Sequence, residues 1–144
     1  MPGNDVFLLD TNILVYAHGI RDDKKHRIAE NIIDRCLKNE IKLAVSSQNL
    51  SEFFSVTTEK GFLAKKDAAD IISDIAEFSG WIKLDFSHKT VLDAARMSEE
   101  HNMSYWDSLL AATMKLNGIL SIYTENTKDF KVPWIRAVNP FEKY

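Results

Sequence analysis

The chain has 144 residues, a length that predicts a single domain over residues 1–144. Its formal net charge is −3 and its pI is near 5.8. Because the chain is acidic overall, a nucleic-acid partner would require a local basic patch. Cys36 is the only cysteine, which excludes an intrachain disulfide and favours a cytoplasmic location. The sequence shows no secretory signal and no run of roughly 20 apolar residues, so we expect no membrane association.

Short apolar runs alternate with helical periodicities along the chain. Strands are predicted at residues 5–10, 42–46, 81–85, 119–124 and 135–138. Helices are predicted at residues 12–19, 24–39, 48–59, 66–79, 88–102 and 105–117. The last of these helices is apolar on most sides, which predicts a central position. The alternation predicts an α/β fold, a three-layer α/β/α sandwich with a mainly parallel sheet of about five strands.

Three acidic residues occupy similar positions relative to the predicted elements. Asp10 directly follows the apolar run 6–9, which is typical of a buried parallel strand. An acid at the exit of such a strand lies at the carboxyl edge of the sheet, where open α/β folds place their ligand sites. Glu52 and Asp107 lie near the starts of two later helices. The order of strands and helices therefore places all three acids at one edge, where they repel each other unless a cation neutralises them.

Helix capping is the structural alternative for each acid alone. Candidate caps occur at three helix starts, namely Ser104 with Asp107, Asn49 with Glu52, and Thr11 or Asn12. Capping does not require three acids to meet at one edge, so the set as a whole favours a divalent-metal site. Carboxylates are hard oxygen ligands that suit Mg²⁺ or Mn²⁺. Such a cation can hold a phosphodiester and lower the pKa of a bound water.

Four segments resemble the PIN-domain nucleases, and in particular their VapC-type toxins: Asp10-Thr11-Asn12, Ser47 through Glu52, Ser104 through Asp107, and Tyr123 through Phe130. The likeness spans nearly the whole chain, in order. It implies an endoribonuclease that depends on Mg²⁺ or Mn²⁺ and hydrolyses RNA phosphodiester bonds as the toxin of a type II toxin–antitoxin pair. It also implies a homodimer and a cognate antitoxin protein as partners.

The resemblance assigns roles by position. Asp10 and Asp107 become the principal metal ligands, and Glu52 binds metal or orients the attacking water. Many relatives carry an aspartate where this chain has Asn126, so Asp129 becomes the candidate for the fourth catalytic and metal-binding acid. The residues expected to contact the substrate are Asn12, Thr124 and Asn126.

Two rival functions stay open at this point. A phosphotransfer domain with an acidic metal pocket needs paired acids after its first strand and a lysine after its last, whereas Asp10 stands alone and no lysine is well placed. A PIN fold that binds RNA or protein without catalysis is the other rival, because Asn126 replaces an acid.

Two further features lie outside the acidic set. The basic residues before the second helix form either a solvated helix start, which is the simpler interpretation, or a phosphate-steering surface; they are Arg21, Lys24, Lys25, His26 and Arg27. Trp106 is expected to pack beneath the acidic site and not to touch the substrate.

Overall fold

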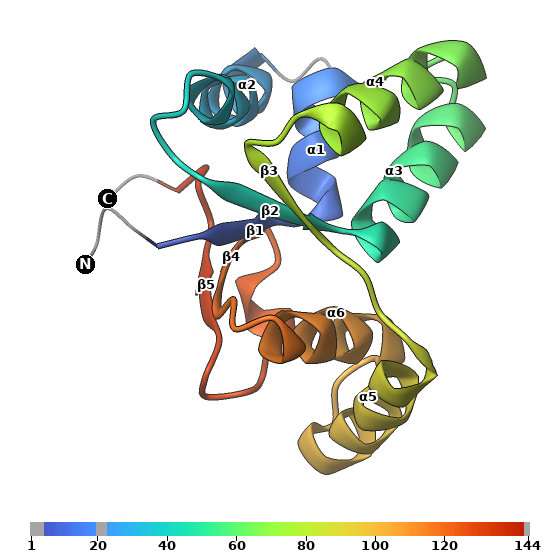
Figure 1. The fold of residues 1–144 in the computed structure, drawn as a ribbon, viewed down its shortest axis with the longest axis vertical. Coiled ribbons are helices and arrows are strands. Elements are labelled where there is room, and N and C mark those ends of the chain that lie inside the picture. Colours follow the sequence, from blue (N-terminus) through green and yellow to red (C-terminus); the bar gives the residue numbers. More distant parts are fainter. Residues whose placement is uncertain (1–4, 20–22, 143–144) are drawn as a thin grey trace.

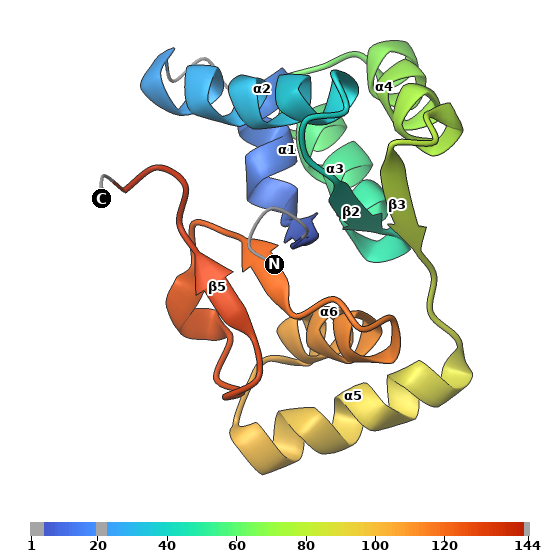
Figure 2. The ribbon, with the colours of Figure 1, turned by 60° about the vertical axis from the view of Figure 1, so that its left-hand side comes forward.

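The structure, a computed structural model, describes residues 5–19 and 23–142 (Figures 1 and 2). In chain order the elements are β1 (Phe7–Leu9), α1 (Thr11–His18), α2 (Asp23–Leu37), β2 (Leu43–Ser46), α3 (Ser47–Glu59), α4 (Lys65–Glu77), β3 (Trp81–Leu84), α5 (His88–His101), α6 (Tyr105–Leu116), β4 (Ser121–Tyr123), the 3₁₀ turn η2 (Thr127–Asp129) and β5 (Arg136–Val138). The sheet order is β3-β2-β1-β4-β5, and all four pairings are parallel. The predicted α/β fold is confirmed.

Helices cover both faces of the sheet. Helices α1 to α4 lie on one face and α5 with α6 on the other (Figure 1). Successive strand residues point to opposite faces, so Leu9 joins the core beneath α1 to α4, while Leu8 joins the core beneath α5 and α6. Residues 108–114 of α6 are all buried, which confirms the predicted central position of this helix. None of the described helices is long and apolar enough to cross a membrane.

The parallel register aligns the carboxyl ends of the central strands. Leu9, the last residue of β1, pairs with Tyr123, the last residue of β4. The next backbone N–H, of Asp10, donates to the Tyr123 carbonyl at 3.0 Å. Asp10 and Thr124 therefore leave the sheet side by side, which sets the position of the site described below. Strand β4 starts later than predicted because the Ile119 N–H donates to the Met114 carbonyl at the end of α6.

The helix caps differ in part from those expected. Asp10 itself caps α1, in place of Thr11 or Asn12. Helix α3 is capped by a reciprocal pair between Ser46 and Asn49, so the expected cap of Asn49 with Glu52 is wrong. That expectation failed because the helix starts one residue earlier than predicted, which moves Glu52 beyond its first turn. The predicted cap of α6 by Ser104 is confirmed.

The buried cap of α3 gives a direct stability test. Ser46→Ala removes the hydroxyl that accepts from the Asn49 N–H and donates to the Asn49 Oδ1, at a residue with 1 % exposure. We expect a loss of about 1–2 kcal/mol in the free energy of unfolding, measured with urea. The matched control is Ser87→Ala, which removes the exposed hydroxyl from the capping box of α5 and should cost about 0.5–1 kcal/mol. An equal or smaller loss at Ser46 would contradict the importance of this buried cap.

Candidate active site

A cleft of about 400 Å³ opens at the carboxyl edge of the sheet. Its lining includes five residues singled out from the sequence, which are Asp10, Asn12, Glu52, Asp107 and Asn126. Three of them are acids: Asp10 directly follows β1, and Glu52 and Asp107 come from α3 and α6, which are far away in the chain. The remaining predicted residues, Thr124 and Asp129, are not among the described lining residues, although the buried Thr124 is hydrogen-bonded to Asp10.

Both carboxylate oxygens of Asp10 are held by hydrogen bonds. The backbone N–H of Thr11 donates to Oδ1 at 2.8 Å, and the Thr124 hydroxyl donates to Oδ2 at 2.7 Å. The hydrogen bond from Thr124 therefore orients Asp10. Because Thr124 is fully buried, the predicted contact of its side chain with the substrate does not fit the structure. Each carboxylate oxygen has a second lone pair, which leaves Asp10 able to bind a further partner from the cleft.

The environment of Asp10 disfavours its charge. Burial raises its pKa from 3.8 to about 6, against the lowering effect of the hydrogen bonds from Thr124 and Thr11. The negative charges of Glu52 and Asp107 raise the pKa further. A carboxylate in this position is stabilised by a nearby cation, because opposite charge favours the ionised form.

Glu52 is oriented by a network that begins at the cap of α3. The Thr11 hydroxyl donates to Glu52 Oε1 at 2.7 Å and accepts from the Asn49 amide at 3.1 Å. The Gln48 amide lies 3.5 Å from Glu52 Oε2 and donates to the Trp106 carbonyl at 2.9 Å. The sequence reasoning missed this network, although Gln48 and Glu52 have the i, i+4 spacing that places them on one helix face.

Asp107 lies in the first turn of α6, beside its cap. The Ser104 hydroxyl accepts from the Asp107 N–H at 3.1 Å and donates to Asp107 Oδ2 at 2.8 Å. Burial raises the pKa of Asp107, the Ser104 hydrogen bond opposes that effect, and the charges of Asp129 and Glu52 add to it. Asp129 therefore acts electrostatically on this acid from the η2 turn, even though it does not line the cleft.

The segment after β4 positions the two candidates for the fourth acidic site. Asn126 lines the cleft, and its N–H donates to the Thr124 hydroxyl at 3.1 Å. Asn12 accepts from the Glu125 N–H at 3.4 Å, so it supports this loop. Phe130 is buried and anchors the end of this turn.

Glu125 is turned to a separate group of residues. Its carboxylate forms an ion pair with Lys25 of α2 and accepts a hydrogen bond from the Tyr16 hydroxyl at 3.0 Å. Burial is the largest cause of the raised pKa of Tyr16, followed by its hydrogen bond to Glu125. Because Lys25 neutralises Glu125, this acid does not add to the unbalanced charge of the cleft.

The acids of the cleft have no such basic partner. Across residues 5–19 and 23–142, no lysine, arginine or histidine forms an ion pair with Asp10, Glu52 or Asp107. In the same part of the chain, no three acidic, histidine or cysteine side chains converge into a ready-made metal site. The fit to a divalent cation therefore rests on donor type and charge: three carboxylates, one largely desolvated, face a cleft whose described lining residues carry no positive charge.

The side chain of Trp106 is 61 % exposed, so the expectation that it packs beneath the site is wrong. It lines a neighbouring hollow of about 520 Å³ with Phe86 and Leu109, and this hollow shares Gln48 and Glu52 with the site network. Trp106 is exposed because it opens the first turn of α6, where its backbone carbonyl is held by Gln48 while its ring projects outward. Leu109 and Leu110 of the same helix are apolar and buried, so the local sequence favoured a buried Trp106 as well.

Comparisons with known proteins place the chain in a structural family. Among solved structures, a chain of the toxin–antitoxin complex from Klebsiella pneumoniae matches with a TM-score of 0.66 and 22% identity, over 95% of this chain and 99% of that one. Mycobacterium tuberculosis VapC20, a sarcin-ricin loop cleaving toxin, matches with a TM-score of 0.68 and 16% identity, over 89% and 97%. VapBC2 from Rickettsia felis, bound to a promoter DNA fragment, matches with a TM-score of 0.67 and 22% identity, over 93% and 98%.

These structural likenesses show a shared fold. No curated protein matches the sequence significantly. The family model of the PIN domain, however, matches residues 7–133. This match includes β1, the acids of the cleft and the η2 turn, and it covers most of the chain. The protein therefore belongs to the PIN domain family.

Proposed function

We propose that this chain is a divalent-metal-dependent endoribonuclease of the VapC type and the toxin of a toxin–antitoxin pair. The observation that carries the proposal is the cleft, where Asp10, Glu52 and Asp107 meet without a basic partner among the described residues. The structural relatives support it, because one is a toxin that cleaves the sarcin-ricin loop and others are toxin–antitoxin complexes. RNA is then the substrate, and an antitoxin protein and a second copy of the chain are the expected partners.

Asp10 and Asp107 are the proposed principal ligands of Mg²⁺ or Mn²⁺. Thr124 and the Thr11 N–H fix the orientation of Asp10, and Ser104 fixes that of Asp107. When bound, the cation would polarise the scissile phosphate and lower the pKa of a water. Glu52, held by the Thr11 hydroxyl, can accept a proton from that water or bind the cation directly. The described residues of the cleft lining include no histidine, lysine or arginine that could form an acid–base pair for a metal-free reaction.

The fourth acid is proposed to be Asp129. Its charge acts on Asp107, while Asn126 reaches the cleft lining with a neutral amide. Asn126 can offer its carbonyl oxygen to a cation or to the substrate but cannot offset the charge of a second cation. Asn12 accepts a hydrogen bond from the N–H of Glu125, directly before Asn126.

The first prediction concerns metal-dependent cleavage. Asp10→Asn and Asp107→Asn should each reduce cleavage of single-stranded RNA by orders of magnitude, because each removes a negative charge from the proposed cation site. The measurement is RNA cleavage with Mg²⁺ and with excess chelator. The control Asp93→Asn, at an exposed position of α5, should retain activity. Full activity of an Asp10 variant, or of the wild type in chelator, would falsify the mechanism. If the wild-type protein binds RNA but does not cleave it in Mg²⁺, a binding module without catalysis becomes the better interpretation.

The second prediction concerns the stability of the metal-free protein. The pKa of Asp10 is about 6 when folded, against 3.8 for the ordinary group. The folded state therefore binds more protons between these values, and stability falls as pH rises from about 4 to about 6. The two pKa values set an upper limit of about 3 kcal/mol on this loss.

Asp10→Asn should abolish that loss, so in chelator at neutral pH the variant should be as stable as the wild type or more stable. Urea unfolding at acidic and neutral pH measures the difference, with Asp93→Asn as the control for removing an exposed carboxylate. A marked loss of stability in Asp10→Asn at neutral pH would instead assign Asp10 a purely structural role as the cap of α1.

The third prediction assigns the fourth acid. Asp129→Asn should lower activity less than Asp10→Asn and raise the Mg²⁺ concentration needed for half-maximal rate, because it removes a charge that acts on Asp107. Asn126→Asp should be tolerated, since it adds a carboxylate to the same cleft. Metal titrations of cleavage by the variants decide the question. If Asp129→Asn matches the wild type at limiting Mg²⁺, the site has three effective acids and a one-metal mechanism.

A further inference from the structure

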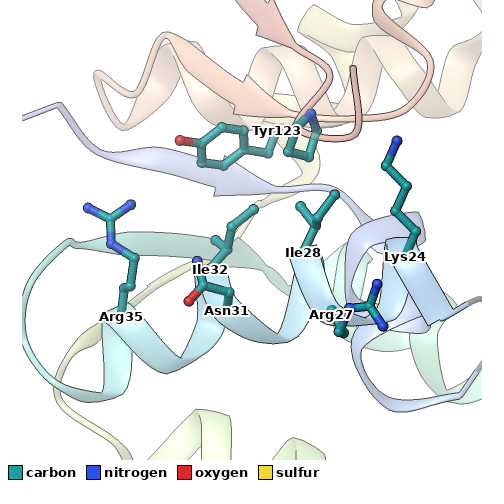
Figure 3. Close-up of a pocket in the computed structure, with 8 residues that line it drawn as sticks. Lys24, Arg27, Ile28, Asn31, Ile32, Arg35 and Tyr123 are labelled. Carbon is teal, nitrogen blue, oxygen red and sulfur yellow. The ribbon is translucent and has the colours of Figure 1, made fainter. Parts of the chain in front are cut away.

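A second concave surface, here called the basic groove, lies between α2 and the C-terminal part of the sheet (Figure 3). It has a volume of about 310 Å³, and the residues that matter are Lys24, Arg27, Ile28, Ile32, Arg35 and Tyr123. Figure 3 shows Ile28 and Ile32 pointing from α2 toward the side of Tyr123, with Lys24 and Arg35 at opposite ends of the helix face. Four residues of the predicted basic cluster, Lys24 through Arg27, lie at the start of α2, and Arg21 lies outside the described residues.

The charge of the basic groove is opposite to that of the acidic cleft. Lys24, Arg27 and Arg35 line the groove, and no acid whose side chain the structure describes is among the lining residues. Lys24 and Arg27 are exposed and form no ion pair with any residue whose side chain the structure describes. Arg35 has only a 3.6 Å contact with Glu40. A chain with a net charge of −3 thus carries a local positive surface, which is what an acidic protein needs to attract a polyanion.

The interior of the basic groove is apolar and aromatic. The Tyr123 ring stacks on Phe7, with the ring centroids 4.1 Å apart and the planes inclined by 14°. Ile28 and Ile32 supply the opposing apolar wall. Cationic side chains around an aromatic surface are the combination with which proteins bind single-stranded nucleic acid, because phosphates pair with the cations while bases stack on the rings.

The basic groove adjoins the acidic cleft. Tyr123 in the groove and Asn126 in the cleft are three residues apart, so their Cα atoms lie no more than about 11 Å apart. Lys25 of α2 and Tyr16 of the cleft lining are joined through Glu125 at this boundary. A single strand of a few nucleotides can therefore occupy both surfaces at once.

We propose that the basic groove binds the single-stranded RNA segment next to the cleavage site. Lys24 and Arg27 pair with its phosphates, and a base packs against Ile28, Ile32 and the Tyr123 ring. The acidic cleft repels the phosphate backbone, so the groove supplies the affinity that holds the strand there. The proposal rests on RNA being the substrate, as proposed above, but it concerns binding and can be tested without catalysis.

The test measures binding of a fluorescent oligouridylate of about 12 nucleotides, a length within the usual range for single-strand sites, in excess chelator so that no metal-dependent cleavage occurs. The variant Lys24→Ala/Arg27→Ala should weaken binding at least about fivefold at low salt. It should also reduce the slope of log affinity against log salt by about 1.4, because each lost phosphate contact contributes about 0.7. The control Lys65→Ala/Lys89→Ala removes two exposed lysines from α4 and α5 and should bind like the wild type.

A second variant guards against an effect of folding. Asn31→Glu places a negative charge at an exposed position of the groove lining without removing any packed side chain, and it should also weaken binding. In cleavage assays both groove variants should raise KM with kcat nearly unchanged, as expected when uniform binding is lost.

Unchanged RNA affinity in both groove variants would overturn the proposal and leave the basic groove to a protein partner. Equal weakening in the control would also overturn it, since the effect would then reflect total charge. Groove-dependent binding by a wild-type protein that never cleaves RNA would support the groove and reject the proposed catalytic function, so the two failures are distinguishable.

Discussion

The site depends on carboxylates that the fold brings together but does not neutralise. The parallel pairing of β1 with β4 places Asp10 beside Thr124, whose hydroxyl fixes one carboxylate oxygen while the N–H of Thr11 fixes the other. Glu52 and Asp107 reach the same cleft from α3 and α6, and their charges act on Asp10. Hydrogen bonds hold the acids in orientation without removing their repulsion, so a cation is the natural complement of the cleft.

The same fold places a positively charged groove next to the negatively charged cleft. The ion pair of Lys25 with Glu125 lies between the acidic cleft and the basic groove, and it removes the charge of Glu125 from the balance of the cleft. In the proposed complex, a polyanionic strand would be attracted by the groove and repelled by the cleft until a divalent cation is present. Strand binding and metal binding would then be separate contributions, carried by α2 on one side and by the carboxyl ends of β1 and β4 on the other.

The sequence predicted the fold closely because the signals were local. The apolar run before Asp10, the helical stripes and the Ser104 cap each lie within a few residues, and every predicted strand and helix is present with small changes at its ends. The gathering of Asp10, Glu52 and Asp107 in one cleft also followed from element order. The orienting contacts could not be predicted in this way, because Thr124 lies 114 residues from Asp10. The exposure of Trp106 likewise depends on how α6 packs, which no local pattern reports.

The central claim is that the charge of the cleft is complemented by a divalent cation, and calorimetric titration of Mn²⁺ into the RNA-free protein at neutral pH tests it most directly. We expect saturable binding by the wild type, weaker binding by Asp10→Asn and Asp107→Asn, and unchanged binding by the groove variant Lys24→Ala/Arg27→Ala. Absence of binding by the wild type, or equal affinity in the Asp10 and Asp107 variants, would contradict the claim.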